Sequence, residues 1–340
     1  MWRAMNSLVA IDRPDVLAGL RRLGGKLMEI ILHVGAHRTA TTSFQHYLRE
    51  HGATISATGT GLWGPLRTRN GLFSGLFPGP VATVKRPSLD RVRGRIALQL
   101  EKSRARGVKK LLITDENMIG TSRHCVRTGL LFPSVGERMA RYNAAFGGGI
   151  NQIVLTIRSP ESWWESAAAY SVQRGACVPT QAKLDKLATM ARTWRDVIID
   201  LACAVPHAEI KVTTYEEFAG RPKAFLAQAT GIDAPKDSQT RWLNRSPDLP
   251  ALRAILAERG DDPDLLPDGT GRWHPFTGAQ SAMMRETYAD DLFWLTAGAD
   301  GLATLTEDTP RTRAGKSQPA GDMKEGQHHD SQHRKLAQSG

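Results

Sequence analysis

Residues 30–48 read IILHVGAHRTATTSFQHYL, and this stretch decides the fold class. The apolar run 30–34 fits a buried strand, and Gly35 interrupts it. Small and polar residues follow, and then the four-residue spacing of Phe44 and Leu48 predicts a helix. A strand, a turn and a helix in this order are the layout of a phosphate-binding loop, in which the N–H groups at the helix start hold an anion.

This loop lacks the lysine of nucleoside triphosphatases, whose pattern is Gly, four residues and Gly-Lys-Ser/Thr. Ala40 stands at the second glycine, Thr41 at the lysine and Thr42 at the hydroxyl that holds magnesium. Arg38, the remaining charge, lies earlier in the loop. The loop therefore predicts an anion shorter than a triphosphate, with Arg38 facing its far end; no obvious cluster of metal ligands occurs in the sequence, and we expect no bound metal. An alanine at position 40 is unstrained in helical geometry and strained at positive φ.

The composition of the 340 residues narrows the class of partner. The formal charge of +11 favours anionic ligands, whereas the 6 % aromatic content and the lack of a basic-aromatic pattern argue against a nucleic-acid module. No apolar run approaches the ~18 residues of a membrane span. The three cysteines are odd in number and widely spaced, which excludes a disulfide framework and a zinc site. We therefore expect a reducing, cytoplasmic location.

Strand and helix signals alternate along the chain. Strands are expected at 29–34, 109–117, 152–158 and from 208, and helices at 41–51, 88–106, 159–175 and 181–203. The alternation predicts an α/β fold with a P-loop-containing parallel β-sheet and helices on both faces. Residues 60–87, rich in glycine, proline and arginine, are expected to form a long functional loop. We expect one domain over 28–305, after an extension at 1–27 and before a disordered tail at 306–340.

A second motif, LTIRSPESWWESAAAY, spans residues 155–170. Arg158 ends a strand, where ligands of open parallel sheets bind, and Ser166 and Tyr170 lie on one face of the following helix. An arginine can hold a phosphate through two parallel bonds, and a serine adds a donor. The alternative is that Arg158 pairs with Glu161 or Glu165 and that Ser166 is only a small residue at a helix contact.

Together the two motifs resemble those of the sulfotransferases that use 3′-phosphoadenosine-5′-phosphosulfate (PAPS). The resemblance implies a sulfotransferase-like domain over 28–305 and PAPS as the sulfate donor, with Arg158 and Ser166 at its 3′-phosphate. Around the 5′-phosphosulfate it places Gly35, Ala36, Arg38, Thr39, Ala40, Thr41 and Thr42. Two positions depart from the usual pattern, because Arg38 replaces a lysine and Ala40 replaces a glycine.

A third, fainter likeness lies in GRWHPFT at 271–277, which is similar to a late Gly-x-Trp loop over the cofactor in this family. The Arg-Lys-Gly that usually precedes the tryptophan is missing. Arg272 is the candidate to replace it at the cofactor.

The implied reaction is transfer of a sulfuryl group to a hydroxyl or amine of an unidentified acceptor: a glycan, a lipid or a small molecule. Arg38 is the candidate electrostatic clamp for the charge that develops on the leaving oxygen. Glu116, after the strand LLIT, is the candidate base through a raised pKa, unless it caps a turn or binds an arginine; His37 is its rival. His33 is expected in the core. A P-loop kinase and a degenerate nucleotide-binding protein without catalysis are the alternative functions.

The loop at 60–87 is the candidate acceptor region. Its basic residues suit an acidic saccharide, whereas its apolar residues suit a lid over a lipid-like or small aromatic acceptor. The basic residues are Arg67, Arg69, Lys85 and Arg86, and the apolar ones are Leu72, Phe73, Leu76 and Phe77. A solvated basic loop is the third possibility.

Overall fold

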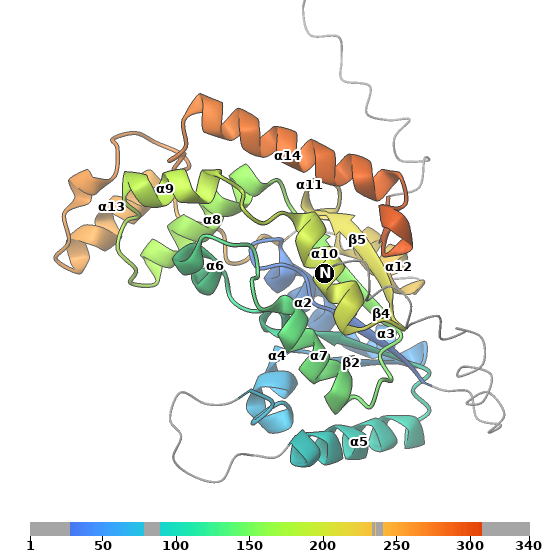
Figure 1. The fold of residues 1–340 in the computed structure, drawn as a ribbon. Coiled ribbons are helices and arrows are strands. Elements are labelled where there is room, and N and C mark those ends of the chain that lie inside the picture. The colour runs from blue at the N-terminus through green and yellow to red at the C-terminus, as the bar shows by residue number, and fades with distance from the viewer. Residues whose placement is uncertain (1–27, 78–88, 233–234, 236–240, 308–340) are drawn as a thin grey trace, which may run out of the picture. The chain divides into compact units, whose positions relative to one another are not determined.

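The computed structural model of the chain describes residues 28–77, 89–232, 235 and 241–307. A six-stranded, all-parallel sheet with the strand order β2-β3-β1-β4-β5-β6 forms its centre (Figure 1). The strands are β1 (Glu29–His33), β2 (Thr60–Trp63), β3 (Lys110–Thr114), β4 (Gln152–Ile157), β5 (Glu209–Thr214) and β6 (Thr304–Leu305). The predicted α/β class with a parallel sheet is confirmed.

Helices connect and flank the strands. The α-helices are α2 (Thr41–Glu50), α3 (Gly52–Ala57), α4 (Pro65–Arg67), α5 (Leu89–Ala105), α6 (Ser122–Thr128), α7 (Val135–Ala145), α8 (Pro160–Gln173), α9 (Gln181–Ala188), α10 (Trp194–Ala204), α11 (Tyr215–Phe218), α12 (Pro222–Thr230), α13 (Leu249–Glu258) and α14 (Gly278–Thr296). Shorter turns are the π-turn η1 (Thr68–Leu72) and the 3₁₀ turns η2 (Glu116–Ile119), η3 (Pro263–Leu265) and η4 (Ala299–Gly301). None of these helices combines the length and hydrophobicity that a membrane span requires.

Strand β1 lies in the middle of the sheet and is buried on both faces. Its side chains alternate, so that Ile31 packs with α2, α3 and α12, while Ile30 and Leu32 pack with α5, α7, α8 and α10. The chain runs from β1 to β2 and β3 on one side and then crosses to β4 and β5 on the other. Open parallel sheets bind ligands outside the carboxyl ends of their strands at such a switch point. The carboxyl end of β1 is therefore the place to look for a site.

Two sequence predictions need correction. Residues 60–63, expected in a loop, form the edge strand β2, in which Thr60 pairs with Lys110. The region 181–203, expected as one helix, is two helices, α9 and α10. Met190 has a φ of 48°, which ends the first helix, and Thr193 starts the second with a capping box.

The predicted extension at 1–27 and all but the first two residues of the predicted tail lie outside the described residues. Through Thr306, the described chain belongs to one compact unit. Residues 78–88 of the predicted functional loop are also outside the described part.

Candidate functional site

The turn between β1 and α2 is built around unusual backbone angles. Gly35, Arg38 and Ala40 have φ values of 53°, 67° and 64°, all in the left-handed region. A Cβ on Gly35 would lie 2.3 Å from Cγ2 of Thr41, so only glycine fits this position. Ala40 does adopt the positive φ that strains an alanine. Inside the turn, the Thr39 hydroxyl donates to the Ala36 carbonyl over 2.7 Å and so braces the loop.

Arg38 reaches from this turn to helix α8. Its Nε donates to Oγ of Ser166 over 2.9 Å, and its Nη2 donates to Oγ of Ser246 over 2.8 Å. The two serine hydroxyls are 2.7 Å apart, and the guanidinium lies 4.6 Å from the ring centroid of Tyr170. The first sequence motif and the second therefore meet in space.

Arg158, at the end of β4, completes this wall. Its Nε donates to Oγ of Ser162 and its Nη1 to the carbonyl of Arg38, both over 2.9 Å. Its guanidinium lies 4.3 Å from the ring centroid of Tyr215. We call the surface formed by Arg38, Arg158, Ser162, Ser166, Tyr170 and Ser246 the cationic wall.

No described carboxylate forms an ion pair with either guanidinium of this wall. Glu161 pairs with Arg285, and Glu165 accepts a 2.8 Å bond from His274, so the alternative in which Arg158 pairs with one of them is wrong. Burial and the Arg158 charge lower the pKa of Arg38 to about 10, and burial lowers the pKa of Arg158 as well. Both remain protonated at neutral pH. Charges this buried normally have a counterion, so the wall is suited to an anionic ligand.

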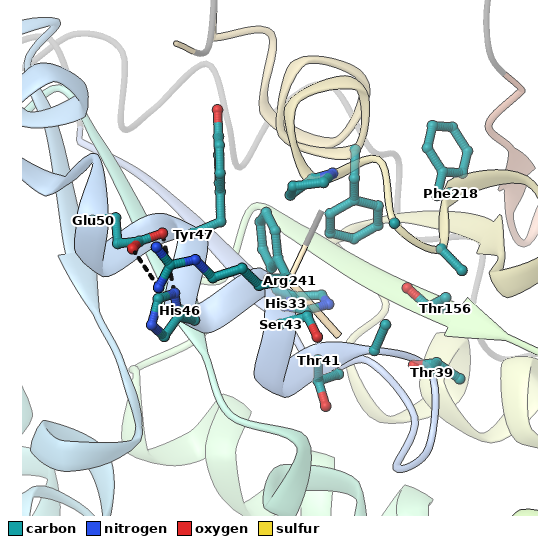
Figure 2. Close-up of a pocket in the computed structure, with 16 residues that line it drawn as sticks. His33, Thr39, Thr41, Ser43, His46, Tyr47, Glu50, Thr156, Phe218 and Arg241 are labelled. Carbon is teal, nitrogen blue, oxygen red and sulfur yellow. Dashed lines mark ion pairs between the residues drawn. The ribbon is translucent and has the colours of Figure 1, made fainter. Parts of the chain in front are cut away.

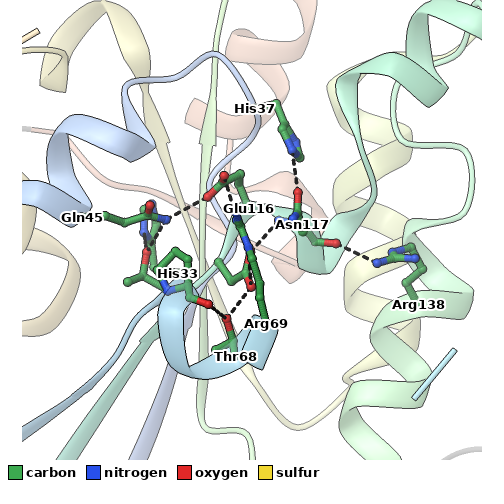
Figure 3. A network of polar contacts seen from close by, with 11 residues as sticks. His33, His37, Gln45, Thr68, Arg69, Glu116, Asn117 and Arg138 are labelled. Atoms are coloured by element: carbon green, nitrogen blue, oxygen red, sulfur yellow. Dashed lines mark hydrogen bonds and ion pairs between the residues drawn. The ribbon is translucent and has the colours of Figure 1, made fainter. Parts of the chain in front are cut away.

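A second polar surface faces the turn from the β3 side. Oε2 of Glu116 accepts from Gln45 over 2.8 Å, and Oε1 accepts from Nη2 of Arg69 over 2.9 Å (Figure 3). The same Arg69 Nη2 donates to Asp115 over 2.7 Å. Thr121, Ser122 and Arg123 continue this surface. We call Arg69, Glu116, Asn117, Thr121, Ser122 and Arg123, with Asp115 behind them, the neutral wall.

The expected raised pKa of Glu116 is not found. Burial acts to raise its pKa, but hydrogen bonds from its own backbone and from Gln45, together with the Arg69 charge, outweigh burial and bring the pKa below its ordinary value. Glu116 is consequently ionised at neutral pH and bound to an arginine, as the alternative interpretation supposed.

His37, the other candidate base, leaves the turn toward Asn117. Its Nε2 lies 3.0 Å from Oδ1 of Asn117, and Arg138 fixes Asn117 through a 2.7 Å bond to its carbonyl (Figure 3). Because an amide oxygen only accepts, Nε2 carries the proton and Nδ1 the lone pair. Nδ1 is buried without a partner in the described structure. Burial lowers the pKa of His37, so the ring is neutral.

The two walls enclose a cavity of about 480 Å³ at the carboxyl end of β1. Cavities of this size hold ligands as large as a nucleotide. The predicted site residues that line it are His37, Arg38, Ala40, Thr41, Thr42, Glu116, Arg158, Ser166 and Arg272. Gly35, Ala36 and Thr39 do not line it, because they are buried in the turn and shape it. Arg272 is exposed and comes from the predicted late loop.

Several residues of this cavity belong to no pattern that could be recognised in the sequence. Ser246, which bonds to Arg38, lies in an irregular segment 80 positions after Ser166. Trp242 and Arg245 line the cavity from the same segment, and the Arg245 guanidinium lies 5.1 Å from the ring centroid of Trp242. Sequence spacing predicts which residues of one strand and the following helix lie close together. It does not predict residues from distant segments that tertiary packing places beside them.

A smaller pocket of about 40 Å³ lies on the other side of α2 (Figure 2). It has room for water but not for a nucleotide. His33 borders it and belongs to the core as predicted: its Nδ1 is 2.9 Å from Oγ1 of Thr114, and Phe44 and Phe225 pack against its ring. Burial lowers the pKa of His33 to about 4.

A scan against protein-family models finds no match to the chain, and a search of curated proteins finds no significant relative. The described residues contain no group of three or more His, Cys, Asp or Glu side chains placed to share a metal ion. The geometry of the cavity is therefore the basis on which function is inferred.

Proposed function

We propose that the protein is a sulfotransferase that moves a sulfuryl group from PAPS to a hydroxyl of an acceptor. The observation that carries the proposal is the cationic wall: the buried guanidinium of Arg158 and the half-buried one of Arg38 have no carboxylate partner among the described residues and lie beside a glycine turn at the switch point of a parallel sheet. In this proposal the turn acts as a P-loop for the 5′-phosphosulfate. Arg158 and Ser166 hold the 3′-phosphate.

The identity of the anion is argued from the missing lysine. Thr41, at the lysine position, is buried and offers only a hydroxyl to the cavity. A triphosphate with magnesium would lack its main cationic partner there, which speaks against a kinase. A 3′,5′-substituted nucleotide instead presents two separate anionic groups, and the wall offers two guanidiniums to match them.

In the reaction, a new S–O bond forms to the acceptor oxygen, the S–O bond to the donor phosphate breaks, and its electron pair stays on the phosphate oxygen. Arg38 stabilises that negative charge as a permanent cation. The acceptor proton goes to Glu116, which lines the cavity and is ionised; its lowered pKa and its bond to Arg69 make it a weaker base than a carboxylate with the raised pKa expected from the sequence. His37 is the weaker candidate for the base because its free Nδ1 is buried.

A titration tests the proposal directly. Isothermal calorimetry compares adenosine 3′,5′-bisphosphate, adenosine 5′-phosphate and magnesium-ATP as ligands of the full chain. We expect the bisphosphate to bind at least about tenfold more tightly than the monophosphate, because a charge-assisted bond is worth about 1.5–3 kcal/mol. Tighter binding of magnesium-ATP would favour a kinase. Transfer of labelled sulfate from PAPS then separates an enzyme from a binding protein without catalysis.

A further inference from the structure

The neutral wall carries hydrogen-bonding groups that the protein itself leaves unused. Ser122 is only 2 % exposed and lines the cavity, and its hydroxyl makes no hydrogen bond to a described residue. The Asn117 amide uses its oxygen for His37, while its nitrogen has no partner in the described structure. Both groups line the cavity, Ser122 as a buried residue and Asn117 as a half-buried one, so both are available to a polar ligand there.

Arg69 and Glu116 add a donor and an acceptor beside them. Nε and Nη2 of Arg69 donate to the carboxylates of Asp115 and Glu116, and its Nη1 makes no bond to a described residue. The Glu116 carboxylate accepts from Gln45 and Arg69, and its four lone-pair positions leave room for a further bond. The wall can thus bind several hydroxyl groups at once, each as donor or acceptor.

The charges of the two walls differ. On the neutral wall, Arg69, Arg123 and Glu116 line the cavity, and Asp115 behind them pairs with Arg69, so the charges nearly balance. On the other side, four lining arginines, Arg38, Arg158, Arg245 and Arg272, outnumber Glu165, the carboxylate that lines that side. An acidic group would gain little at the neutral wall and would find its attraction at the cationic wall instead.

Apolar side chains do not cover the neutral wall. Its described lining residues are all polar or charged. Leu72, Phe73 and Leu76, which suited a lid over a lipid-like acceptor, are buried in the core with α5 and α7. Arg67 lies 4.7 Å from the ring centroid of Trp63 and donates to Gln99, away from the cavity. The described part of the loop therefore places Leu72, Phe73 and Leu76 in the core rather than in a lid, and of its two arginines only Arg69 lines the cavity, where it is paired with Asp115 and Glu116.

From these contacts we infer that the acceptor is an uncharged, polyhydroxylated molecule of the sugar or cyclitol type. Its reacting hydroxyl lies at Glu116, and its neighbouring hydroxyls bind Ser122, the Asn117 amide and Nη1 of Arg69. This inference rests on the proposed sulfotransferase function. It adds the chemical class of the second substrate.

The first experiment measures transfer of labelled sulfate from PAPS to five probes with the full chain. The probes are maltose, myo-inositol, a disaccharide that contains glucuronic acid, 4-nitrophenol and dodecanol in micelles. We expect kcat/KM for maltose or inositol to exceed that for each of the other three by about tenfold or more, because the others leave polar groups unpaired or bring a charge. Faster transfer to the phenol, the alkanol or the acidic disaccharide overturns the acceptor class and leaves the sulfotransferase function standing.

The second experiment compares Ser122→Ala with Ser171→Ala. Ser171 is an equally buried serine, but its hydroxyl donates to the Ala167 carbonyl and does not line the cavity. We expect Ser122→Ala to raise KM for the best neutral probe by about three- to tenfold, the loss of one hydrogen bond, while Ser171→Ala leaves KM unchanged. Unchanged KM in Ser122→Ala overturns the role of the neutral wall.

The affinity for adenosine 3′,5′-bisphosphate distinguishes a wrong acceptor class from a wrong assignment as a sulfotransferase. Normal nucleotide affinity with no transfer to any of the five probes overturns the acceptor class. Failure of the wild-type chain to bind the nucleotide overturns the sulfotransferase function itself.

Discussion

Arg38 donates a 2.9 Å hydrogen bond to Ser166, although 128 positions separate them in the sequence. Arg38 belongs to the turn after β1, and Ser166 belongs to α8, which follows β4. Because β1 and β4 are neighbours in the sheet, both motifs arrive at the same edge. The bond ties the two halves of the proposed donor site to each other and makes Arg38 the residue most sensitive to substitution.

Replacing Arg38 by alanine tests its role as a clamp. We expect kcat for sulfate transfer to fall by about 10²- to 10³-fold, because removal of one preorganised donor at a developing charge has that effect. Arg38→Lys, which keeps the charge and loses the bond geometry, should fall in between. Initial rates with the best acceptor give the measurement. Arg141→Ala, on the surface of α7, is the control, and equal kcat in Arg38→Ala and this control would remove Arg38 from the mechanism.

Arg158 is expected to bind the 3′-phosphate of the nucleotide. Arg158→Ala should weaken binding of adenosine 3′,5′-bisphosphate about 10- to 100-fold more than binding of adenosine 5′-phosphate. The comparison matters because Arg158 also holds the Arg38 carbonyl, so some loss is expected with both nucleotides. Calorimetric titration of the two ligands measures the difference. Equal losses would show that Arg158 only supports the turn.

Two substitutions decide which group is the base. Glu116→Gln keeps the size of the side chain and removes its charge, and we expect kcat to fall by about 10²-fold or more. His37→Asn should lower kcat by less than about tenfold, through its contact with Asn117. Steady-state rates at saturating acceptor measure both effects. The opposite order of the two losses would transfer the role of base to His37.

The central strands could be predicted because each is a short apolar run between helical segments. The sequences of β1, β3 and β4 show this apolar pattern, which can be recognised without any tertiary information. β2 has only four residues, one of them a glycine, and β6 has two. Such edge strands gain their order from the neighbour that they pair with, so a local pattern does not reveal them.

The site could be predicted where its residues are close in sequence. Arg158 and Ser166 lie on one strand and the next helix, so their spacing fixes their geometry. Ser122 and Ser246 come from segments that packing alone brings to the cavity. The expected raised pKa of Glu116 does not occur, because its backbone hydrogen bond, the Arg69 charge and the Gln45 hydrogen bond outweigh desolvation. A sequence pattern contains no information about such a balance.

Gly35 should tolerate no side chain. We expect Gly35→Ala to lower the free energy of unfolding by about 2–4 kcal/mol, because its Cβ would overlap Thr41 and its φ of 53° disfavours an L-residue. Gly94→Ala, in the interior of α5 with open space around it, should raise stability by about 0.5–1 kcal/mol. Urea unfolding measures both changes. Equal effects of the two substitutions would contradict the described geometry of the turn.

His33 should make the fold sensitive to acid. Its pKa of about 4 in the fold lies below the ordinary value of 6.5, so the unfolded chain binds the proton more tightly. The stability contributed by the neutral ring is complete above pH 6.5 and is lost as the pH falls toward 4, by about 3 kcal/mol in all.

The test compares His33→Gln, which keeps a polar group near Thr114, with the wild type by urea unfolding between pH 7 and pH 4.5. The variant should lose stability less steeply on acidification, by up to about 1.4 kcal/mol per pH unit, because one proton fewer is taken up on unfolding. His207→Gln, at an exposed position, should follow the wild-type profile. Parallel profiles for His33→Gln and the wild type would mean that His33 is not held neutral by the core.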